Sequence, residues 1–221
     1  YLAGGEGSDS KTPAVIDRTQ EFVARSDQGW FVFVNLMDAH LPYHPPDKYA
    51  AEFAPDVDSA AVCQNSKAYN SGARAVNDTE WQEIRALYDA EIAHMDAELG
   101  RLFDWLRETG RWEETMVVVC ADHGELHGEH DLYGHEFCLY DPLVNVPLLV
   151  KHPDVAADPD GTVELVDLYH TVLDALGETG GVPASPGDEA VTLDPRRSVL
   201  SPDHRAVPAE PDPADPAHPG T

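Results

Sequence analysis

The sequence between residues 116 and 135 is the feature that most constrains the fold of this chain. An apolar run from Met116 to Ala121 ends abruptly at Asp122-His123-Gly124. A short apolar run bounded by turn residues is the pattern of a buried strand, so a carboxylate and an imidazole are expected directly after a strand. Open parallel sheets bind their ligands at the carboxyl ends of strands. We therefore expect a functional site at Asp122 and His123.

A second apolar run ends in the same way. Residues Trp30–Met37 are predicted to form a strand buried on both faces of a parallel sheet. Residues 38–46 follow as a polar loop rich in proline, and they include His40 and His44. Because the carboxyl ends of parallel strands meet at one edge of a sheet, this loop is expected near Asp122.

The other periodic segments predict an α/β fold. Apolar residues at helical spacing predict helices over residues 14–25, 80–109 and 164–176, and Asp78 or Thr79 is expected to cap the longest one. Residues 144–150 are predicted to form another strand, with Pro147 indicating an edge or a strand start. Strands that alternate with helices favour a mostly parallel sheet with helices on both faces.

The two ends of the chain carry weaker signals than the domain expected over residues 15–177. Residues 1–14 are rich in Gly, Ser and Asp and are predicted to be a loop or a truncated end. Residues 178–221 are irregular and rich in Pro, Asp and Gly, and from about residue 202 the low-complexity sequence predicts disorder.

The charge of the chain excludes two classes of partner. There are 14 Lys and Arg residues against 41 Asp and Glu residues, which gives a formal net charge of -27, and only four of the basic residues are lysines. Such a surface repels nucleic acids and anionic membranes, so neither is expected as a partner. The acidic residues are scattered through periodic segments, which indicates a folded protein adapted to concentrated salt, as in a halophile.

Cysteine usage and hydropathy bear on the compartment. The three cysteines are Cys63, Cys120 and Cys138, and none of them belongs to a CxxC pair. This pattern disfavours a disulfide framework or a structural zinc site and predicts a reducing, cytoplasmic location. The sequence contains neither a long apolar run nor a signal peptide pattern, so no membrane span is expected.

The residues after the apolar runs have the chemistry of a metal site. The carboxylate of Asp122 and the imidazole of His123 suit a divalent ion such as Ca, Mg, Mn or Zn. An Asp-His-Gly triplet alone is explained equally by turn chemistry, and a closed site needs about four ligands, so further ligands must come from elsewhere. A functional role is favoured for His40 and His135, whereas His44, His127 and His130 are interpreted as surface or structural residues.

Four segments together resemble a known family. They are residues 31–46 (FVFVNLMDAHLPYHPP), 88–106 (beginning YDAEIAHMD), 117–150 (with ADHGE, GEH, GH, LYD and VPLLV in order) and 166–174 (VDLYHTVLD). In content and order they resemble the sulfatases of the alkaline phosphatase superfamily, over about residues 15–177. The resemblance implies a sulfatase-like α/β domain.

The resemblance also implies a role for each site residue. Asp122 and His123 match the pair that ligates the divalent metal, which for a sulfatase is most often calcium. His40 matches a catalytic histidine that contacts the sulfate and protonates the leaving group. His135 matches a position, lysine or histidine in this family, that binds a sulfate oxygen and stabilises charge during transfer.

One part of the family pattern is missing from the sequence. Sulfatases attack with a formylglycine made in a Cys/Ser-x-Pro-x-Arg motif, near an Asp-Asp pair that completes the metal site, and neither motif occurs here. The chain is therefore expected to be the carboxyl-terminal part of a longer enzyme, with a sheet that is incomplete at its amino-terminal side. Because transfer needs an attacking group, the isolated chain is expected to be inactive.

Three functions remain open from the sequence. The first is a sulfatase-like hydrolase of sulfuric esters that works with a divalent metal, acting on a small sulfate or phosphate ester together with the missing amino-terminal half. The second is a phosphodiesterase or phosphonate monoester hydrolase of the same superfamily. The third is a non-catalytic remnant or partner subunit, which the absent nucleophile favours for the isolated chain.

Overall fold

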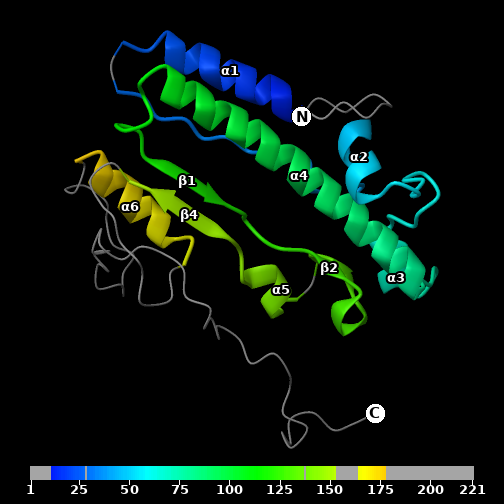
Figure 1. Cartoon of the computed structure of the whole chain (residues 1–221). Helices are drawn as coiled ribbons and strands as arrows, with labels where there is room; N and C mark the ends of the chain where they lie inside the picture. The colour runs from blue at the N-terminus through cyan, green and yellow to red at the C-terminus, as the bar shows by residue number, and fades with distance from the viewer. Residues whose placement is uncertain (1–10, 28, 137, 153–163, 178–221) are drawn as a thin grey trace, which may run out of the picture. The chain divides into compact units, whose positions relative to one another are not determined.

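The computed structural model of the chain describes residues 11–27, 29–136, 138–152 and 164–177. These residues form two compact units. The first unit comprises the described residues within 11–113 and 126–134, and the second comprises those within 114–125 and 135–177. Figure 1 labels most of their helices and strands. Most of residues 1–14 and 178–221, where a loop and an irregular tail were predicted, lie outside the described residues.

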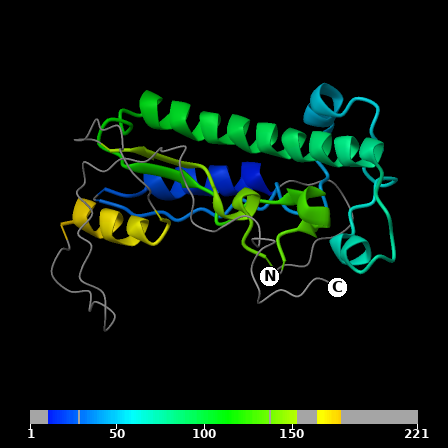
Figure 2. The ribbon, with the colours of Figure 1, turned by 90° about the horizontal axis from the view of Figure 1, so that it is seen from below.

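The first unit is mostly helical. Its elements are α1 (Thr12–Ala24), α2 (Asp47–Phe53), α3 (Ser66–Asn70), α4 (Asp78–Glu108), β2 (Leu126–His127), the 3-10 turn η1 (Glu129–Asp131) and β3 (Tyr133–Gly134). Helix α1 runs alongside α4, and α2 packs against α4 further along its length (Figure 2). The helix predicted over residues 14–25 is confirmed, although α1 begins at Thr12, inside the stretch expected as a loop.

Helix α4 is the element around which the first unit is built. Its amino terminus is fixed by a capping box, in which the Asn77 side chain accepts from the backbone and Glu80 bonds back to Asn77. The cap is therefore Asn77, one residue before the predicted Asp78. Gly110, at φ +70°, ends the helix, and the N–H of Arg111 donates to the Leu106 carbonyl at 2.8 Å.

The core of the first unit gathers on one stripe of α4. Trp81, Ile84 and Leu87 recur at helical spacing and are buried. They pack with residues from the loops and from the β2–β3 hairpin: Tyr43, Ala54, Val62 and Tyr133. The cluster is rich in aromatic rings, and Trp81 and Tyr133 meet edge to face at 5.0 Å between centroids. The hairpin is thereby anchored to α4.

The strand predicted over Trp30–Met37 is not formed within the described residues. Exposure alternates along this segment, and Phe31, Phe33 and Met37 are 62%, 82% and 58% exposed. This period of two is that of extended backbone with side chains on alternate sides. A strand also needs a hydrogen-bonded neighbour, and the described residues supply none to this segment. The prediction of a strand buried on both faces was therefore wrong.

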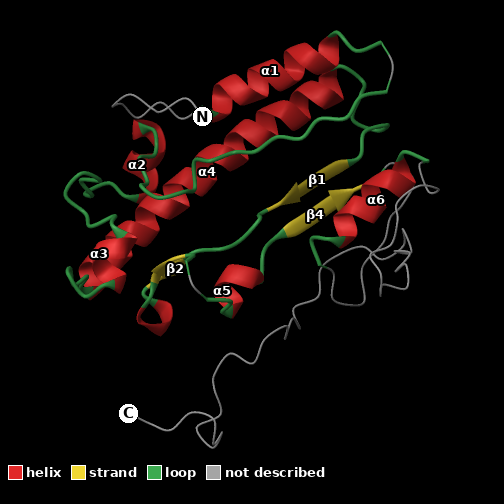
Figure 3. Cartoon of the chain, turned by 180° about the vertical axis from the view of Figure 1, so that it is seen from behind, coloured by secondary structure: helices red, strands yellow, loops and turns green. Residues whose placement is uncertain are grey.

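The second unit contains the sheet that carries the Asp122 loop. Its elements are β1 (Val117–Cys120), α5 (Asp141–Val144), β4 (Leu148–Lys151) and α6 (Asp167–Ala175). β1 and β4 pair antiparallel, with Val117 opposite Lys151 and Cys120 opposite Leu148. In Figure 3 their two arrows lie side by side and point in opposite directions. The strand predicted at the start of the Asp122 loop is confirmed, as is the helix predicted over residues 164–176.

The described sheets differ from the predicted one. Both are two-stranded and antiparallel, so the mostly parallel sheet is not confirmed by the described residues. β1 is half-buried and exposed at Cys120, rather than buried throughout. The strand predicted over residues 144–150 is formed from Leu148, after Pro147, because proline has no N–H to donate to a ladder. Val144, where that strand was expected to begin, instead ends the short helix α5. Among the described residues, no helix is long and apolar enough to cross a membrane.

Candidate active site

The Asp122 loop begins where the β1–β4 ladder ends. The last sheet-like bond is the N–H of Ala121 to the Pro147 carbonyl at 3.4 Å. The Asp122 side chain then projects into solvent, 88% exposed, and its Oδ1 accepts the N–H of His123 at 3.1 Å. This local bond turns the chain at the strand end, so that both side chains leave the ladder together.

The geometry of the two side chains suits one divalent ion. His123 Nδ1 lies 2.8 Å from the Gly124 carbonyl, and because a carbonyl only accepts, Nδ1 carries the proton. The lone pair of Nε2 is then available, at 3.9 Å from Asp122 Oδ1. Two ligand bonds of roughly 2.0 to 2.4 Å each can span that gap. An oxygen and an imidazole nitrogen are suitable donors for Ca, Mn, Mg or Zn.

Gly124 lets the loop approach α5 closely. Its N–H donates to the Leu143 carbonyl at 2.8 Å, and a Cβ built on it would collide with the carbonyl oxygen of Pro142. Leu143 is itself buried, so the loop rests on a fixed support. The glycine of the triplet is therefore required by packing as well as by the turn.

His135 lies beside His123 in the same unit. The ring centroids are 4.1 Å apart and the planes are inclined by 32°. His135 Nδ1 is 3.1 Å from Oε1 of Glu125, whose side chain is only 4% exposed. A carboxylate only accepts, so it fixes the proton on Nδ1 and orients the ring. Three residues predicted for the site, Asp122, His123 and His135, are thus brought together.

His40 belongs to the first unit. It lies in residues 38–46, which we call the His40 loop, and its ring is exposed, with Nδ1 2.7 Å from the Leu41 carbonyl. The loop is held by Tyr43, whose backbone N–H donates to Gln64 Oε1 and whose carbonyl accepts from Gln64 Nε2. The Leu41–Pro42 bond is cis.

The histidines interpreted as structural or surface residues occupy other places. His127 is buried in the aromatic core, where its Nε2 lies 3.0 Å from the Tyr43 hydroxyl. Burial lowers the pKa of His127 to about 4, so the ring is neutral at pH 7. The His44 ring lies 3.2 Å from the Ser59 hydroxyl, and His130 has a positive φ of 55° in the η1 turn.

One group of buried polar residues escaped the sequence analysis. Glu91 and His94 are each 4% exposed on α4, and the Asp38 side chain is 6% exposed beside them. Burial, and to a smaller extent the charge of Asp38, raise the pKa of Glu91. The hydrogen bond from the His44 N–H lowers it, and the net result is a pKa of about 7. The sequence did contain a signal for this group. Positions 91 and 94 continue the inward-facing stripe of positions 84 and 87, and a carboxylate is rarely buried at such a position without a partner.

The metal ligands are incomplete within the described residues. No group of three or more His, Cys, Asp or Glu side chains there is arranged to hold an ion. Asp122 and His123 supply two donors, and a protein site holds an ion with about four or more, waters included. The donor set fits part of a divalent site.

The arrangement of the elements is that of a known class of fold. A phosphonate monoester hydrolase from Agrobacterium radiobacter matches with a TM-score of 0.60 at 24% identity, over 80% of this chain and 40% of that chain. BT4656, solved with its substrate D-glucosamine-2-N,6-O-disulfate, matches with a TM-score of 0.52 at 16% identity, over 78% of this chain and 49% of that chain. These likenesses define an alkaline phosphatase/sulfatase-type fold.

Comparison of the amino-acid sequence with family models identifies the family within this class of fold. The family model described as "Sulfatase" matches residues 6–178, which is more than half of the chain. The chain therefore belongs to the sulfatase family, as the resemblance predicted.

Curated relatives agree with this assignment. Arylsulfatase K of Danio rerio is 37% identical over 139 residues, covering 61% of this chain and 24% of the relative. The multifunctional alkaline phosphatase superfamily protein PehA of Trinickia caryophylli is 33% identical over 114 residues, covering 50% of this chain and 22% of the relative. The chain thus spans about a quarter or less of the length of these relatives.

Proposed function

We propose that this chain forms part of the active site of a sulfatase-family hydrolase of sulfuric esters, with a divalent metal as cofactor. The observation that carries the proposal is the convergence of Asp122 Oδ1 and His123 Nε2, 3.9 Å apart, beside the ring of His135. A carboxylate, a metal-competent imidazole and a second imidazole that meet in the second unit suit the binding of an ion and of an anionic ester.

Asp122 and His123 are the proposed metal ligands. The loop presents Oδ1 and Nε2 in one direction because Nδ1 of His123 is occupied by the Gly124 carbonyl. A bound divalent ion would neutralise charge on an ester oxygen. Calcium is the ion proposed first, because the chain belongs to the sulfatase family, and Mn, Mg and Zn are alternatives to be compared in the assay.

His135 is proposed to bind an oxygen of the ester group. The buried Glu125 carboxylate orients the ring through Nδ1, and the ring lies beside that of His123, with 4.1 Å between the two centroids. His40 is proposed to contact the same group and to protonate the leaving oxygen. Its ring is exposed, and the loop that carries it is fixed at Tyr43, so the imidazole is accessible on a held support.

The attacking group is assigned to a polypeptide segment outside this sequence. The chain contains no Cys/Ser-x-Pro-x-Arg motif and no Asp-Asp pair, so the residues here bind and orient but do not attack. An amino-terminal half would supply the nucleophile, the other metal ligands and further strands of the sheet. The cytoplasmic location and the halophilic origin stay predictions of the composition.

A second candidate is hydrolysis of phosphate diesters or phosphonate monoesters. The similarity to PehA, named as a multifunctional alkaline phosphatase superfamily protein, is the observation that favours it. Both reactions transfer a tetrahedral anionic group, so His135 and His40 would serve either one. The third candidate, a non-catalytic remnant or partner subunit, predicts that no longer protein contains the nucleophile motif.

The deciding experiment begins with the gene upstream of Tyr1. An open frame that encodes the missing motifs supports an enzyme, whereas stop codons in every frame support the remnant. The longer protein is then assayed in molar salt with Ca or Mn, with an aryl sulfate and an aryl phosphonate as parallel substrates. We expect sulfate release, and a loss of at least about 10²-fold in kcat/KM for Asp122→Asn. A folded, metal-loaded protein that hydrolyses neither ester overturns the proposal.

A further inference from the structure

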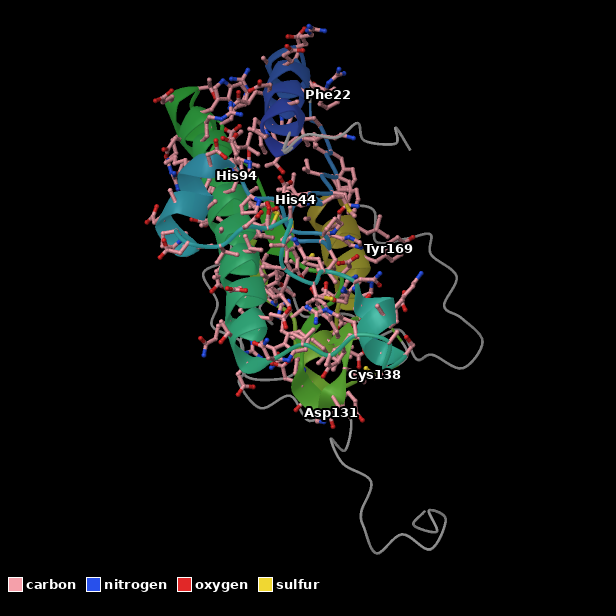
Figure 4. All side chains as sticks on the ribbon, turned by 90° about the vertical axis from the view of Figure 1, so that its right-hand side faces the viewer. Phe22, His44, His94, Asp131, Cys138 and Tyr169 are labelled. Carbon is pink, nitrogen blue, oxygen red and sulfur yellow. The ribbon has the colours of Figure 1, made fainter. Side chains whose placement is uncertain are left out.

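The His40 loop is fastened to α4 by a buried carboxyl group. Oε1 of Glu91 accepts the backbone N–H of His44 at 2.8 Å. Glu91 is 4% exposed, so this bond lies out of water, where it contributes more than on the surface. Figure 4 shows His44 beside α4, the helix that also carries His94. His44 is four residues after His40, and the bond thus fixes the carboxyl-terminal part of the loop.

A second carboxylate lies at the start of the same loop. The Asp38 side chain is 6% exposed, accepts a hydrogen bond from the Thr12 hydroxyl of α1, and lies 3.9 Å from Nε2 of His94. The negative charge of Asp38 acts directly on Glu91. Both ends of the loop are therefore held by carboxyl groups in one buried environment.

The charged and titratable groups around Glu91 come from each packed element. The loop contributes Asp38 and the ring of His44, and α4 contributes His94. From α2, Tyr49 packs on the His94 ring at 5.1 Å, and the Lys48 ammonium group lies 4.8 Å from the centre of the Tyr49 ring. Lys48 is exposed, so its charge is screened by water, and Asp38 is the nearest buried charge.

The energetic consequence is a conflict between the two carboxyl groups. Two buried carboxylates repel each other, and burial penalises each negative charge. A proton on Glu91 removes this repulsion, and the other carboxyl oxygen can still accept the hydrogen bond from the His44 N–H. When the proton leaves, the second charge is relieved most easily if the loop separates from α4 and water enters.

We propose that Glu91 is a positioning residue for His40, and that the proton on its buried carboxyl keeps the His40 loop held against α4. The catalytic role of His40 rests on the proposed function, whereas the fastening of its loop does not. Glu91 touches the backbone of the loop and acts on His40 only through it.

The direction of the pH dependence follows from the pKa of Glu91. Burial against the loop raises the pKa of Glu91 from the ordinary 4.5 to about 7, so a closed loop binds the proton more tightly than an open, hydrated one would. The closed loop is therefore most stable below pH 4.5, loses stability as the pH rises to about 7, and changes no further above it. Opening becomes easier by up to about 10²-fold across this window.

The test follows the His44 backbone amide by hydrogen exchange in the full chain. After correction for intrinsic exchange, protection of this amide in the wild-type protein is expected to fall by up to about 10²-fold from pH 4.5 to pH 7. In Glu91→Gln the side-chain oxygen of Gln can still accept the hydrogen bond from His44, but the side chain cannot ionise. The protection of the His44 amide is therefore expected to stay constant over this pH range. Asp89→Asn removes an exposed acid from the same helix and is expected to behave as the wild type.

A second readout reports on His40 itself. The difference between the NMR shifts of the His40 backbone amide in the wild type and in Glu91→Gln is expected to grow from pH 4.5 to pH 7, because only the wild-type loop responds to the Glu91 proton. A fall in His44 protection that persists in Glu91→Gln overturns the proposal. A shift difference of the His40 amide that stays constant over this pH range overturns the positioning role. Neither measurement needs metal, substrate or activity, so both are independent of the proposed function.

A variant of the second carboxylate covers the case in which Glu91→Gln does not fold. Burial is the main cause of the raised pKa of Glu91, and the charge of Asp38 adds to it. Asp38→Asn removes that added part, so the fall in His44 protection is expected to be smaller than in the wild type without vanishing. An unchanged fall in Asp38→Asn contradicts the coupling of the two carboxyl groups.

Discussion

His123 and His135 lie with their ring centroids 4.1 Å apart, and each ring is held by its own partner. The Gly124 carbonyl accepts from Nδ1 of His123, and the buried Glu125 carboxylate accepts from Nδ1 of His135. The two imidazoles are thereby oriented independently of each other. This arrangement suits a site in which one imidazole binds a metal ion and its neighbour binds an anion.

The first prediction concerns the metal. We expect the full chain to bind Mn or Ca weakly, because no group of three or more ligating side chains is formed among its described residues, and Asp122→Asn to lower the affinity by at least about tenfold. Isothermal calorimetry on the folded chain measures this directly. Asp131→Asn removes an exposed carboxylate of the η1 turn and serves as the matched control. Equal affinities of the two variants would show that the ion binds elsewhere.

The second prediction concerns the support of the loop. In Gly124→Ala the new methyl group meets the Pro142 carbonyl oxygen, and the shift that relieves it disturbs the bond to Leu143. We expect a loss of about 1 to 3 kcal/mol in the free energy of unfolding, measured by urea denaturation. Gly100→Ala is the control, because nothing lies within 4 Å of the added group in α4, and it is expected to stabilise by about 0.5 to 1 kcal/mol. A Gly124→Ala protein as stable as the wild type contradicts the close approach.

The helices and the family could be predicted from the sequence because their signals are local. The stripe of α4 and the order of the motifs are both written in neighbouring residues. The pairing of strands is not local. The sequence of Trp30–Met37 indicates an extended, apolar segment, but it does not indicate which other segment pairs with it. The predicted parallel strand over those residues failed for that reason.

In the candidate site, too, relationships between neighbouring residues were predicted from the sequence, whereas contacts with distant segments were not. Asp122, His123 and His135 were predicted to belong to one site, and these three side chains lie close together in the second unit. The contact of Glu125 with His135 was not predicted, because a turn residue and a ring-orienting residue look alike in sequence. Glu91 was missed because helical periodicity identifies the positions that face inward but not the loop that each one meets.

The third prediction concerns acid. The pKa of His127 falls from 6.5 to about 4 in the folded protein, so the folded state resists protonation that the unfolded state accepts. Stability from this group is complete above pH 6.5 and is lost as the pH falls to about 4, by roughly 3 kcal/mol. Urea denaturation of His127→Asn at several pH values measures the effect, and its slope between pH 6.5 and 4 is expected to flatten. This sign is opposite to that of Glu91, so His127→Asn and Glu91→Gln are expected to change the slope in opposite directions. Slopes that match the wild type in both variants would assign the pH dependence to other groups.

The fourth prediction concerns salt. A formal net charge of -27 repels itself in the folded state, and surface ion pairs such as Arg107 with Asp104 neutralise little of it. Raising the salt shortens the screening length from about 10 Å at 0.1 M to about 3 Å at 1 M. The midpoint of thermal unfolding is therefore expected to rise between 0.1 M and 2 M KCl, and the salt dependence to weaken at pH 4, where carboxylates are partly protonated. Circular dichroism follows both series, with sucrose at matched water activity as the control for exclusion from the surface. Because screening acts on charge alone, a midpoint that rises equally in sucrose and in salt would contradict self-repulsion as the cause.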